Sequence, residues 1–426
     1  MRNLFILVFL INVYANAFAI SSQNGTFNLS GYGTLAYTSD NVDDLAFIRE
    51  LTQPPITGVA NNPSIKTDPW LTDSRIGVQG LFQYGNTLEV MGLLNIRRQE
   101  ETNLNNSLDW LYLGYHPNEN LNLRFGRVGY DAFLMSDHRH LGYAYPWVRP
   151  STEFYAAIPV YAIDGLDISY NISGQQDIQW KVKAQWGTSK ETFPFGIDNS
   201  YEMESTSWTI GLTRETSYLR IRTRYSEMDI ETNPKALESL YAGLTQIASA
   251  GIVEASDLLQ ELSFKDTKVK YTTLGFSYDN NAWLSQGELG YLKTSSSIVT
   301  NGTTLTGYIN FGKRIGNWTP YVAYSSINPL ESRKQAKTDW NALTGNQAGD
   351  LNSVRDQTLG ILTSTRLDQR TLSLGVRWDI HSQVATKFQW DHTKIRSDGY
   401  GLWWGTTDES KATSVDVLTL TMEFIF

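Results

Sequence analysis

The chain has 426 residues, no cysteine and a formal net charge of −9. The lack of cysteine excludes thiol catalysis, thiolate metal sites and disulfide frameworks. The acidic balance argues against a nucleic-acid-binding protein, and 13 Trp, 23 Tyr and 17 Phe exclude a disordered chain.

The first predicted element is an export signal at residues 1–19. Arg2 gives a positive start, an apolar run follows over residues 4–11, and residues 17–19 (AFA) have the small-x-small form of a cleavage site. The apolar run is too short to cross about 30 Å of hydrocarbon. We therefore expect export, with residues 20–426 as one domain. Export without cysteine is more typical of a Gram-negative envelope protein than of a disulfide scaffold.

Alternation of apolar and polar residues with a period of two dominates the rest of the chain. A pleated strand sends successive side chains to opposite faces, so each such segment has one apolar and one polar face. Past the signal, no run approaches the roughly 18 apolar residues of a spanning helix. The alternating segments include residues 78–83, 88–96, 121–126, 166–172, 178–186, 219–225, 305–311, 372–380 and 418–426.

The connections between these segments alternate strictly between short and long. The short polar turns are residues 84–86, 117–120, 173–177, 214–217, 279–281, 313–317 and 381–383. The long connections are residues 38–73, 97–107, 131–162, 187–205, 227–266, 293–303, 327–369 and 396–413. This rhythm is typical of outer-membrane barrels, which have short periplasmic turns and long extracellular loops.

The pattern predicts an all-β fold, a transmembrane antiparallel up-and-down β-barrel of about 16 strands. Hydrocarbon offers no hydrogen-bond partners, so only helices and closed barrels, which pair all their backbone groups internally, can span a membrane. In such a barrel the apolar faces would contact lipid and the polar faces would line the lumen. Aromatic residues near the strand ends would form two interfacial girdles. The alternative is that these aromatic residues form the core of a soluble β domain.

The third long connection, residues 131–162, differs from the others in composition. Pro146, Pro150 and Pro159 stiffen its path. Its many aromatic residues do not suit a loop surrounded by water, so we expect it to fold inward and pack on the barrel wall. Its charged residues include Asp137, His138, Arg139, His140, Arg149 and Glu153.

These features resemble the Gram-negative outer-membrane porins. Phe125-Gly126-Arg127 resembles the stretch that precedes the third loop of sixteen-stranded porins, and residues 142–150 (GYAYPWVRP) resemble a loop of a poorly characterised gammaproteobacterial group. The resemblance implies a homotrimer and recognition of the last strand, ending at Phe426, by barrel-assembly machinery. It also implies that the third loop forms the pore constriction through Asp137, His138, Arg139, His140, Arg149 and Glu153.

A basic ladder is expected on the lumen wall. Arg220, Arg222 and Arg224 are spaced by two, which places their guanidiniums on one face of a strand. In porins like this one, such a ladder faces acidic loop groups and creates a field across the constriction. The alternative is that the cations pair with wall carboxylates such as Asp167. The predicted ladder comprises Arg124, Arg127, Lys181, Lys183, Arg220, Arg222 and Arg224.

The motifs of common enzymes are absent from the sequence: it has no nucleophile elbow, phosphate-binding loop, dinucleotide fingerprint or His-Glu-x-x-His. We therefore expect no enzyme, no cofactor and no metal, since His138 and His140 at a spacing of two are a weak metal signal. A membrane hydrolase that uses a Ser–His pair has one weak candidate, His392.

The fifth long connection, residues 227–266, predicts helices. Asn233 can cap a helix and Pro234 can occupy its first position, after which apolar residues follow helical spacing. This segment is either a lid over the pore mouth or a contact between subunits of a trimer.

The leading interpretation is an outer-membrane porin, a water-filled channel for passive diffusion of small hydrophilic solutes and ions with a weak anion preference. The alternative is a plugged surface barrel that acts as an adhesin or receptor through its long loops. The expected surroundings are outer-membrane lipid and lipopolysaccharide, and no nucleic-acid partner is expected.

Overall fold

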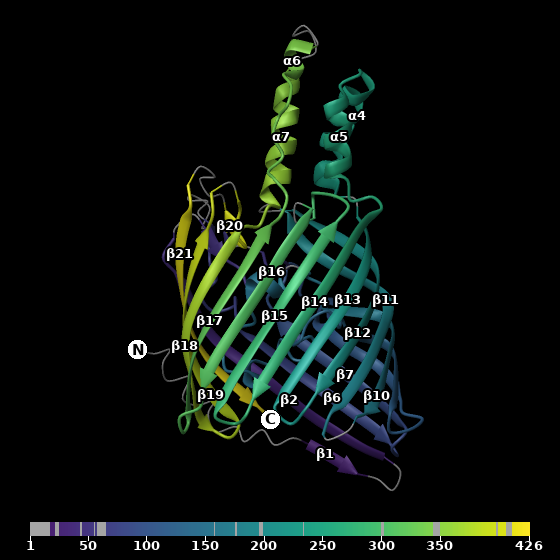
Figure 1. Ribbon diagram of the computed structural model, residues 1–426, viewed down its shortest axis with the longest axis vertical. Helices are drawn as coiled ribbons and strands as arrows, with labels where there is room; N and C mark the ends of the chain where they lie inside the picture. Colours follow the sequence, from purple (N-terminus) through teal and green to yellow (C-terminus); the bar gives the residue numbers. More distant parts are fainter. Residues whose placement is uncertain are drawn as a thin grey trace.

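The computed structural model describes residues 18–21, 25–42, 45–54, 56–57, 65–156, 158–174, 177–195, 199–232, 234–299, 302–343, 350–397, 399–405 and 411–426. Most of the predicted export signal lies outside these residues. Within them, sixteen long antiparallel strands form one closed barrel, as the alternating pattern predicts (Figure 1). A short additional strand, β1 (Phe18–Ser21), pairs with the start of β2.

The barrel strands follow one another around the wall in chain order. They are β2 (Gly25–Asp40), β6 (Arg75–Tyr84), β7 (Leu88–Arg97), β8 (Leu108–Tyr115), β9 (Leu121–Gly129), β10 (Ala162–Ser173), β11 (Gln179–Phe195), β12 (Asn199–Glu215), β13 (Leu219–Glu231), β14 (Thr267–Asp279), β15 (Trp283–Thr294), β16 (Thr303–Lys313), β17 (Trp318–Pro329), β18 (Gln369–His381), β19 (Val384–Ile395) and β21 (Thr413–Ile425). Seven short turns lie at one end of the barrel, and the long loops lie at the other.

The barrel closes where the last long strand, β21, pairs with the first, β2. The terminal Phe426 donates its N–H to the carbonyl of Gly31 at 2.9 Å and accepts the Gly31 N–H at 2.8 Å. The ring of Phe424 lies against Gly33, where an added Cβ would clash with it. Glycine on β2 therefore makes room for an aromatic side chain of β21 where the two strands close the barrel.

The two faces of each strand differ as the alternation predicts. On β8, Leu111 and Leu113 expose 52% and 48% of their surface, whereas Tyr112 between them exposes 7%. Since the exposed apolar residues recur at outward positions around the barrel, the outer wall is an apolar belt. None of the helices in the described part of the chain has the length and apolar character needed to cross a membrane.

The prediction of a long connection at residues 187–205 is wrong. Strands β11 and β12 continue through this stretch and pair in register from Trp186 with Trp208 to Phe195 with Asn199. Ion pairs across the strands, such as Lys190 Nζ to Glu202 Oε2 at 2.9 Å, support the extension. Alternation continues beyond the apolar belt with polar residues on the outward face, which is why the stretch reads as a loop.

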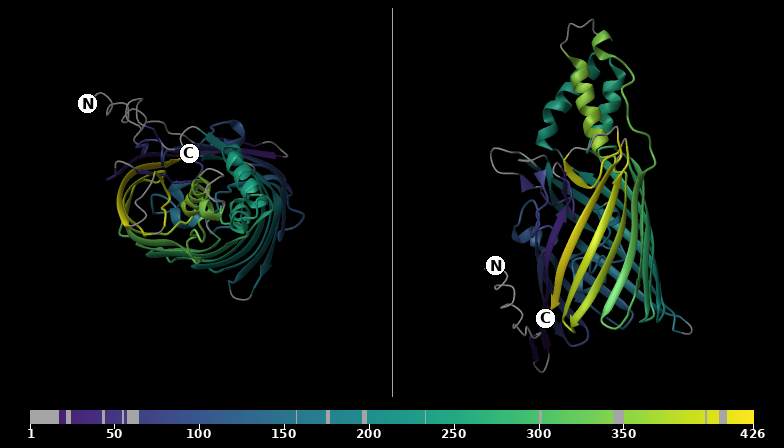
Figure 2. Two further views of the ribbon diagram at one scale, coloured as in Figure 1. Left: turned by 90° about the horizontal axis from the view of Figure 1, so that it is seen from above. Right: turned by 90° about the vertical axis from the view of Figure 1, so that its left-hand side faces the viewer.

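Two long loops carry helices that stand above the barrel (Figures 1 and 2). The predicted helices after β13 are present as η3 (Lys235–Leu237), α4 (Glu238–Ser249) and α5 (Val253–Leu262), although the predicted cap Asn233 lies outside the described residues. The loop after β17 adds α6 (Trp340–Leu343) and α7 (Leu351–Ser364), whose Leu362 is fully buried against the others. These helices form a small bundle whose buried apolar side chains are continuous with the apolar cluster inside the barrel.

Short elements fill the remaining long loops. They are β3 (Leu45–Phe47), β4 (Ile56–Thr57), β5 (Ile65–Lys66), α2 (Leu104–Ser107), η2 (Gly142–Ala144), α3 (Thr152–Tyr155) and β20 (Trp403–Gly405). Strand β20 pairs with β3, so the last long loop joins the first at the barrel mouth.

Candidate functional site: the inward loop

The segment between β9 and β10 crosses the inside of the barrel. Near its start, the Leu134 carbonyl accepts a hydrogen bond from Arg222 on β13 at 3.1 Å. Farther along, the Val148 N–H donates to Gln389 on β19 at 3.0 Å. Because β13 and β19 are widely separated around the wall, the segment spans the lumen. We call residues 131–160 the inward loop.

The first attachment of the inward loop is Asp131. Its carboxylate forms ion pairs with Arg222 and with Arg224, whose Nε lies 2.8 Å from Oδ2, and Lys183 Nζ lies 3.5 Å away. All four side chains are buried. The upper part of the predicted ladder is therefore on the lumen wall, but it is neutralised by the loop instead of facing water.

Beside Asp131, the wall residue Glu288 on β15 joins the loop to an aromatic cluster. The Tyr155 hydroxyl donates to its Oε1 at 2.5 Å and the Leu134 N–H to its Oε2 at 2.7 Å. The rings of Phe133 and Phe154 pack edge to face nearby. Alternation places Glu288 on the inward face of its strand, but no feature of the sequence links it to the loop, so sequence analysis missed it.

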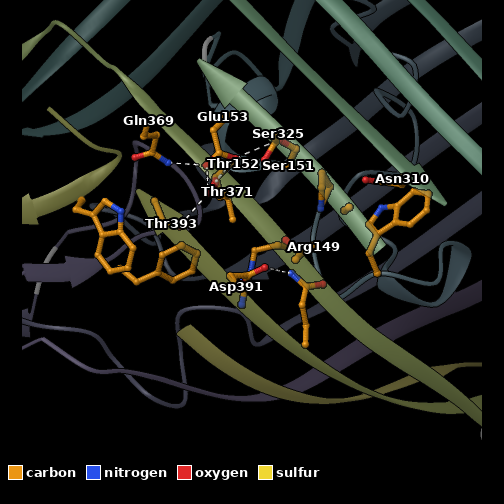
Figure 3. Close-up of a pocket in the computed structure, with 17 residues that line it drawn as sticks. Arg149, Ser151, Thr152, Glu153, Asn310, Ser325, Gln369, Thr371, Asp391 and Thr393 are labelled. Carbon is orange, nitrogen blue, oxygen red and sulfur yellow. Dashed lines mark hydrogen bonds and ion pairs between the residues drawn. The ribbon is translucent and has the colours of Figure 1, made fainter. Parts of the chain in front are cut away.

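The second attachment is Arg149, on the opposite side of the barrel. Its guanidinium lies 2.7 Å from Asp73, just before β6, and 2.6 Å from Asp391 on β19 (Figure 3). All three side chains are buried. Burial raises the pKa of the Asp73 carboxyl, but Arg149 outweighs it and holds that pKa at about 2.

Glu153 is held by the wall next to Arg149. Its carboxylate accepts hydrogen bonds from Gln369 and Ser325, both at 2.7 Å, and from Thr371 (Figure 3). A small cavity of about 30 Å³ lies between these groups, which is room for about two water molecules. Glu153 therefore joins the loop to β17 and β18.

Arg139 and His140 lie in the interior of the inward loop. The Arg139 guanidinium donates to the Val160 carbonyl at 2.9 Å and lies 4.0 Å above the Tyr161 ring. The His140 ring lies 3.6 Å from Glu50. Burial, with Arg97 and Arg139 nearby, lowers the pKa of His140 well below its usual value. Both side chains are buried and stabilise the loop, and they also border a cavity of about 250 Å³ that Asp137 and His138 share.

Asp137 and His138 are the predicted loop residues that contact water. The side chain of Asp137 is exposed and that of His138 is half-buried. Partial burial lowers the pKa of His138, and Asp137 beside it opposes that shift. From the wall, the exposed Lys181 acts electrostatically on Asp137 and the half-buried Arg220 acts on His138. Asp137, Lys181 and Arg220 therefore place charge of both signs on one water-accessible surface beside His138.

The rest of the ladder is partly paired. Arg220 Nη2 lies 2.6 Å from Glu215, and Arg124 Nε lies 3.9 Å from Asp167. Lys183 Nζ also contacts Asp167, at 3.0 Å. The pairing that sequence analysis held as the alternative is thus present for Asp167. Within the described part of the chain, no three His, Asp or Glu side chains gather in a way that could hold a metal ion.

Arg127 does not lie on the lumen wall. It faces Asp164 across β9 and β10, with Nη2 at 2.7 Å from Oδ2, and the next pair on the same face is the exposed Phe125 and Leu166. The predicted lumen position of Arg127 is therefore wrong. Arg124 and Arg127 are three residues apart, and an odd spacing on a strand puts two side chains on opposite faces.

Comparison with known proteins shows the fold. No family model and no curated protein matches the sequence. Among solved structures, the chain is similar to Salmonella typhi OmpF in complex with Daunomycin, at 13% identity and a TM-score of 0.51 over 96% of this chain and 100% of that one. It is also similar to the outer membrane channel DcaP of Acinetobacter baumannii, at 13% identity and a TM-score of 0.50 over 95% and 99%. At this identity, the likeness establishes a porin-type barrel.

Proposed function

We propose that the chain is a porin of the Gram-negative outer membrane, a water-filled channel for passive diffusion of small hydrophilic solutes. One observation carries the proposal: a loop inside the sixteen-stranded barrel is fixed to opposite walls while the outer wall is apolar. The apolar belt suits lipid. A loop fixed across the lumen narrows a passage without closing the barrel itself.

The water-accessible charges define the proposed constriction. Asp137 contributes a negative charge from the loop, with His138 beside it, and Lys181, Arg220 and Arg124 contribute positive charges from the wall. His138 is neutral at pH 7 because its pKa is lowered. The exposed Lys181 then favours a weak anion preference. Arg139, His140, Arg149 and Glu153 hold the loop in place in this proposal.

Conductance of the purified protein in planar bilayers tests the proposal. Ohmic single-channel steps with a reversal potential showing weak anion preference are the expected result. A variant in which a short glycine linker replaces residues 132–160 serves as the insertion control, because it keeps the barrel and removes the obstruction. If this variant conducts and the native protein is silent, the channel proposal fails.

That failure would support the second candidate, a plugged surface barrel that acts through its outer loops. Its supporting observation is the extent of burial along the inward loop, where Phe133, Val148 and Phe154 are fully buried. The helix bundle above the mouth would be the contact surface. The same two conductance traces therefore decide between the candidates.

We also propose a homotrimer surrounded by outer-membrane lipid and lipopolysaccharide, with no chemical reaction and no cofactor. The resemblance of the third-loop residues to porins supports the trimer. Phe426 at the barrel seam suits recognition by barrel-assembly machinery. Cross-linking in native membranes tests the oligomer, and a single band at the monomer mass would contradict it.

A further inference from the structure

Part of the lumen wall is apolar where a polar face was expected. Along β13, the inward face changes from charged to apolar toward the long-loop end. Its inward residues run in the order Arg220, Arg222, Arg224, Ser226, Met228 and Ile230. Met203 on β12, Val269 on β14 and Leu292 on β15 continue the apolar area on the neighbouring strands, and all are buried.

A cavity of about 230 Å³ lies against this apolar wall. The inward loop borders it through Ile158, and the long loops border it through Phe264, just after α5, and through Ile298. All the described residues that line it are uncharged. The cavity therefore lies between the inward loop and the base of the helix bundle.

The size of the cavity exceeds what imperfect packing leaves. Protein interiors contain few voids larger than a water molecule. The cavity is partly open, and by comparison with an enclosed apolar cavity of about 150 Å³ that accepts benzene, it has room for about ten carbon atoms.

The polar atoms at the cavity edge are already engaged by the chain. Thr365 donates its hydroxyl to the Ser297 and Leu362 carbonyls, both at 2.8 Å, and Ser364 donates to the Ile361 carbonyl at 2.7 Å. A polar ligand would lose its hydration without gaining these groups as partners. The lining thus selects against charge and against hydrogen-bonding groups.

We propose that this cavity binds a neutral hydrocarbon-like molecule of about ten carbon atoms at the outer side of the inward loop. The site goes beyond the proposed passage of hydrophilic solutes, because it uses a different surface of the lumen. Binding here rests on the cavity alone and is independent of whether the barrel conducts.

The test uses 1-fluoronaphthalene, followed by fluorine NMR, with the protein in lipid nanodiscs. The native protein is expected to give a saturable, protein-bound signal distinct from the probe dissolved in lipid. Val269→Trp fills the cavity and Met228→Lys puts a charge into it. Each is expected to weaken binding about tenfold or more, because the indole takes up the volume of the probe and a probe beside the ammonium group would deprive that charge of its hydration.

Leu274→Trp is the matched control, because it adds the same side chain on the outward face of the same strand, where Leu274 is exposed. It should bind the probe like the native protein. Resistance of the folded barrel to unfolding on a semi-native gel confirms that each variant is assembled. The proposal is overturned if the native protein gives no saturable signal, or if the folded cavity variants bind as tightly as Leu274→Trp.

Discussion

The inward loop is attached at two points by ion clusters of opposite arrangement. At the β13 side, the loop supplies the carboxylate of Asp131 and the wall supplies the cations Arg222, Arg224 and Lys183. At the β19 side, the loop supplies the cation of Arg149, held between the carboxylates of Asp73 and Asp391. At each attachment the loop supplies one charged side chain, and the surrounding residues supply two or three of the opposite sign.

This difference teaches what each attachment leaves behind when its loop charge is lost. Without Asp131, the wall cations still have carboxylates nearby, since Asp167 lies 3.0 Å from Lys183. Without Arg149, Asp73 and Asp391 lose the cation that they share. A buried charge without a partner is costly, so the β19 attachment is the more sensitive of the two.

The largest expected effect follows from Arg149→Met. Removing one partner of a buried ion pair costs about 3–5 kcal/mol, so the free energy of unfolding should fall by about that much. Guanidinium unfolding of the protein in lipid vesicles measures this change. Released from β19, the loop should also give larger and noisier single-channel currents.

The matched control for Arg149→Met is the triple variant with Asp73→Asn and Asp391→Asn, which removes the stranded carboxylates. It should recover most of the lost stability. If Arg149→Met alone unfolds like the native protein, the cluster does not hold the loop.

Asp131→Asn should have a smaller effect on stability, about 1–3 kcal/mol, because one charged acceptor is replaced by a neutral one. Its stronger signature is electrical: one negative charge is removed from beside Arg222, Arg224 and Lys183 while Asp167 remains near Lys183, so the reversal potential in a salt gradient should move toward anions. Asp164→Asn removes a carboxylate from the outward face, where it pairs with Arg127, and should leave the reversal potential unchanged. Equal shifts in both variants would contradict the assignment.

Glu153→Gln tests the contact beside Arg149, where the loop carboxylate is held by uncharged donors on β17 and β18. The amide keeps one acceptor oxygen but turns a donor toward Gln369, Ser325 or Thr371, all of which donate to Glu153. The unpaired donors should cost about 1–3 kcal/mol of unfolding free energy, less than Arg149→Met. Glu153→Asp is the companion variant, because it keeps the charge but shortens the side chain. If both variants are as stable as the native protein, this contact is dispensable.

The sequence predicts the barrel well because alternation is local. Each strand carries its own period of two, and seven short turns mark one end without reference to distant residues. The attachments of the inward loop are not predictable in this way. Asp131 meets Arg224 across 93 residues of chain, and no local pattern states which strand faces the loop.

Two errors about the lumen have a local cause. Arg124 and Arg127 both precede the inward loop, but their spacing of three places the two side chains on opposite faces of the strand. Met228 and Ile230 share the parity of Arg224, so the sequence does show an apolar stretch on the inward face. A uniformly polar lumen is expected only if every lumen residue contacts water. Here loops from other parts of the chain pack against these residues in place of water, so apolar side chains are accommodated.

The smallest expected effect is a pH response of the loop surface between the two attachments. The pKa of His138 is lowered by partial burial, so the side chain is neutral at pH 7 and gains a positive charge as the pH falls through that lowered value. Anion preference should therefore increase as the pH falls through the range below the usual histidine pKa of about 6.5. His138→Gln should abolish the pH-dependent part of the shift, whereas the buried His140 should contribute little over this range because its pKa lies far lower. A pH response that persists in His138→Gln would show that another group titrates. It would also show that the water-exposed surface of the loop does not set the ion selectivity.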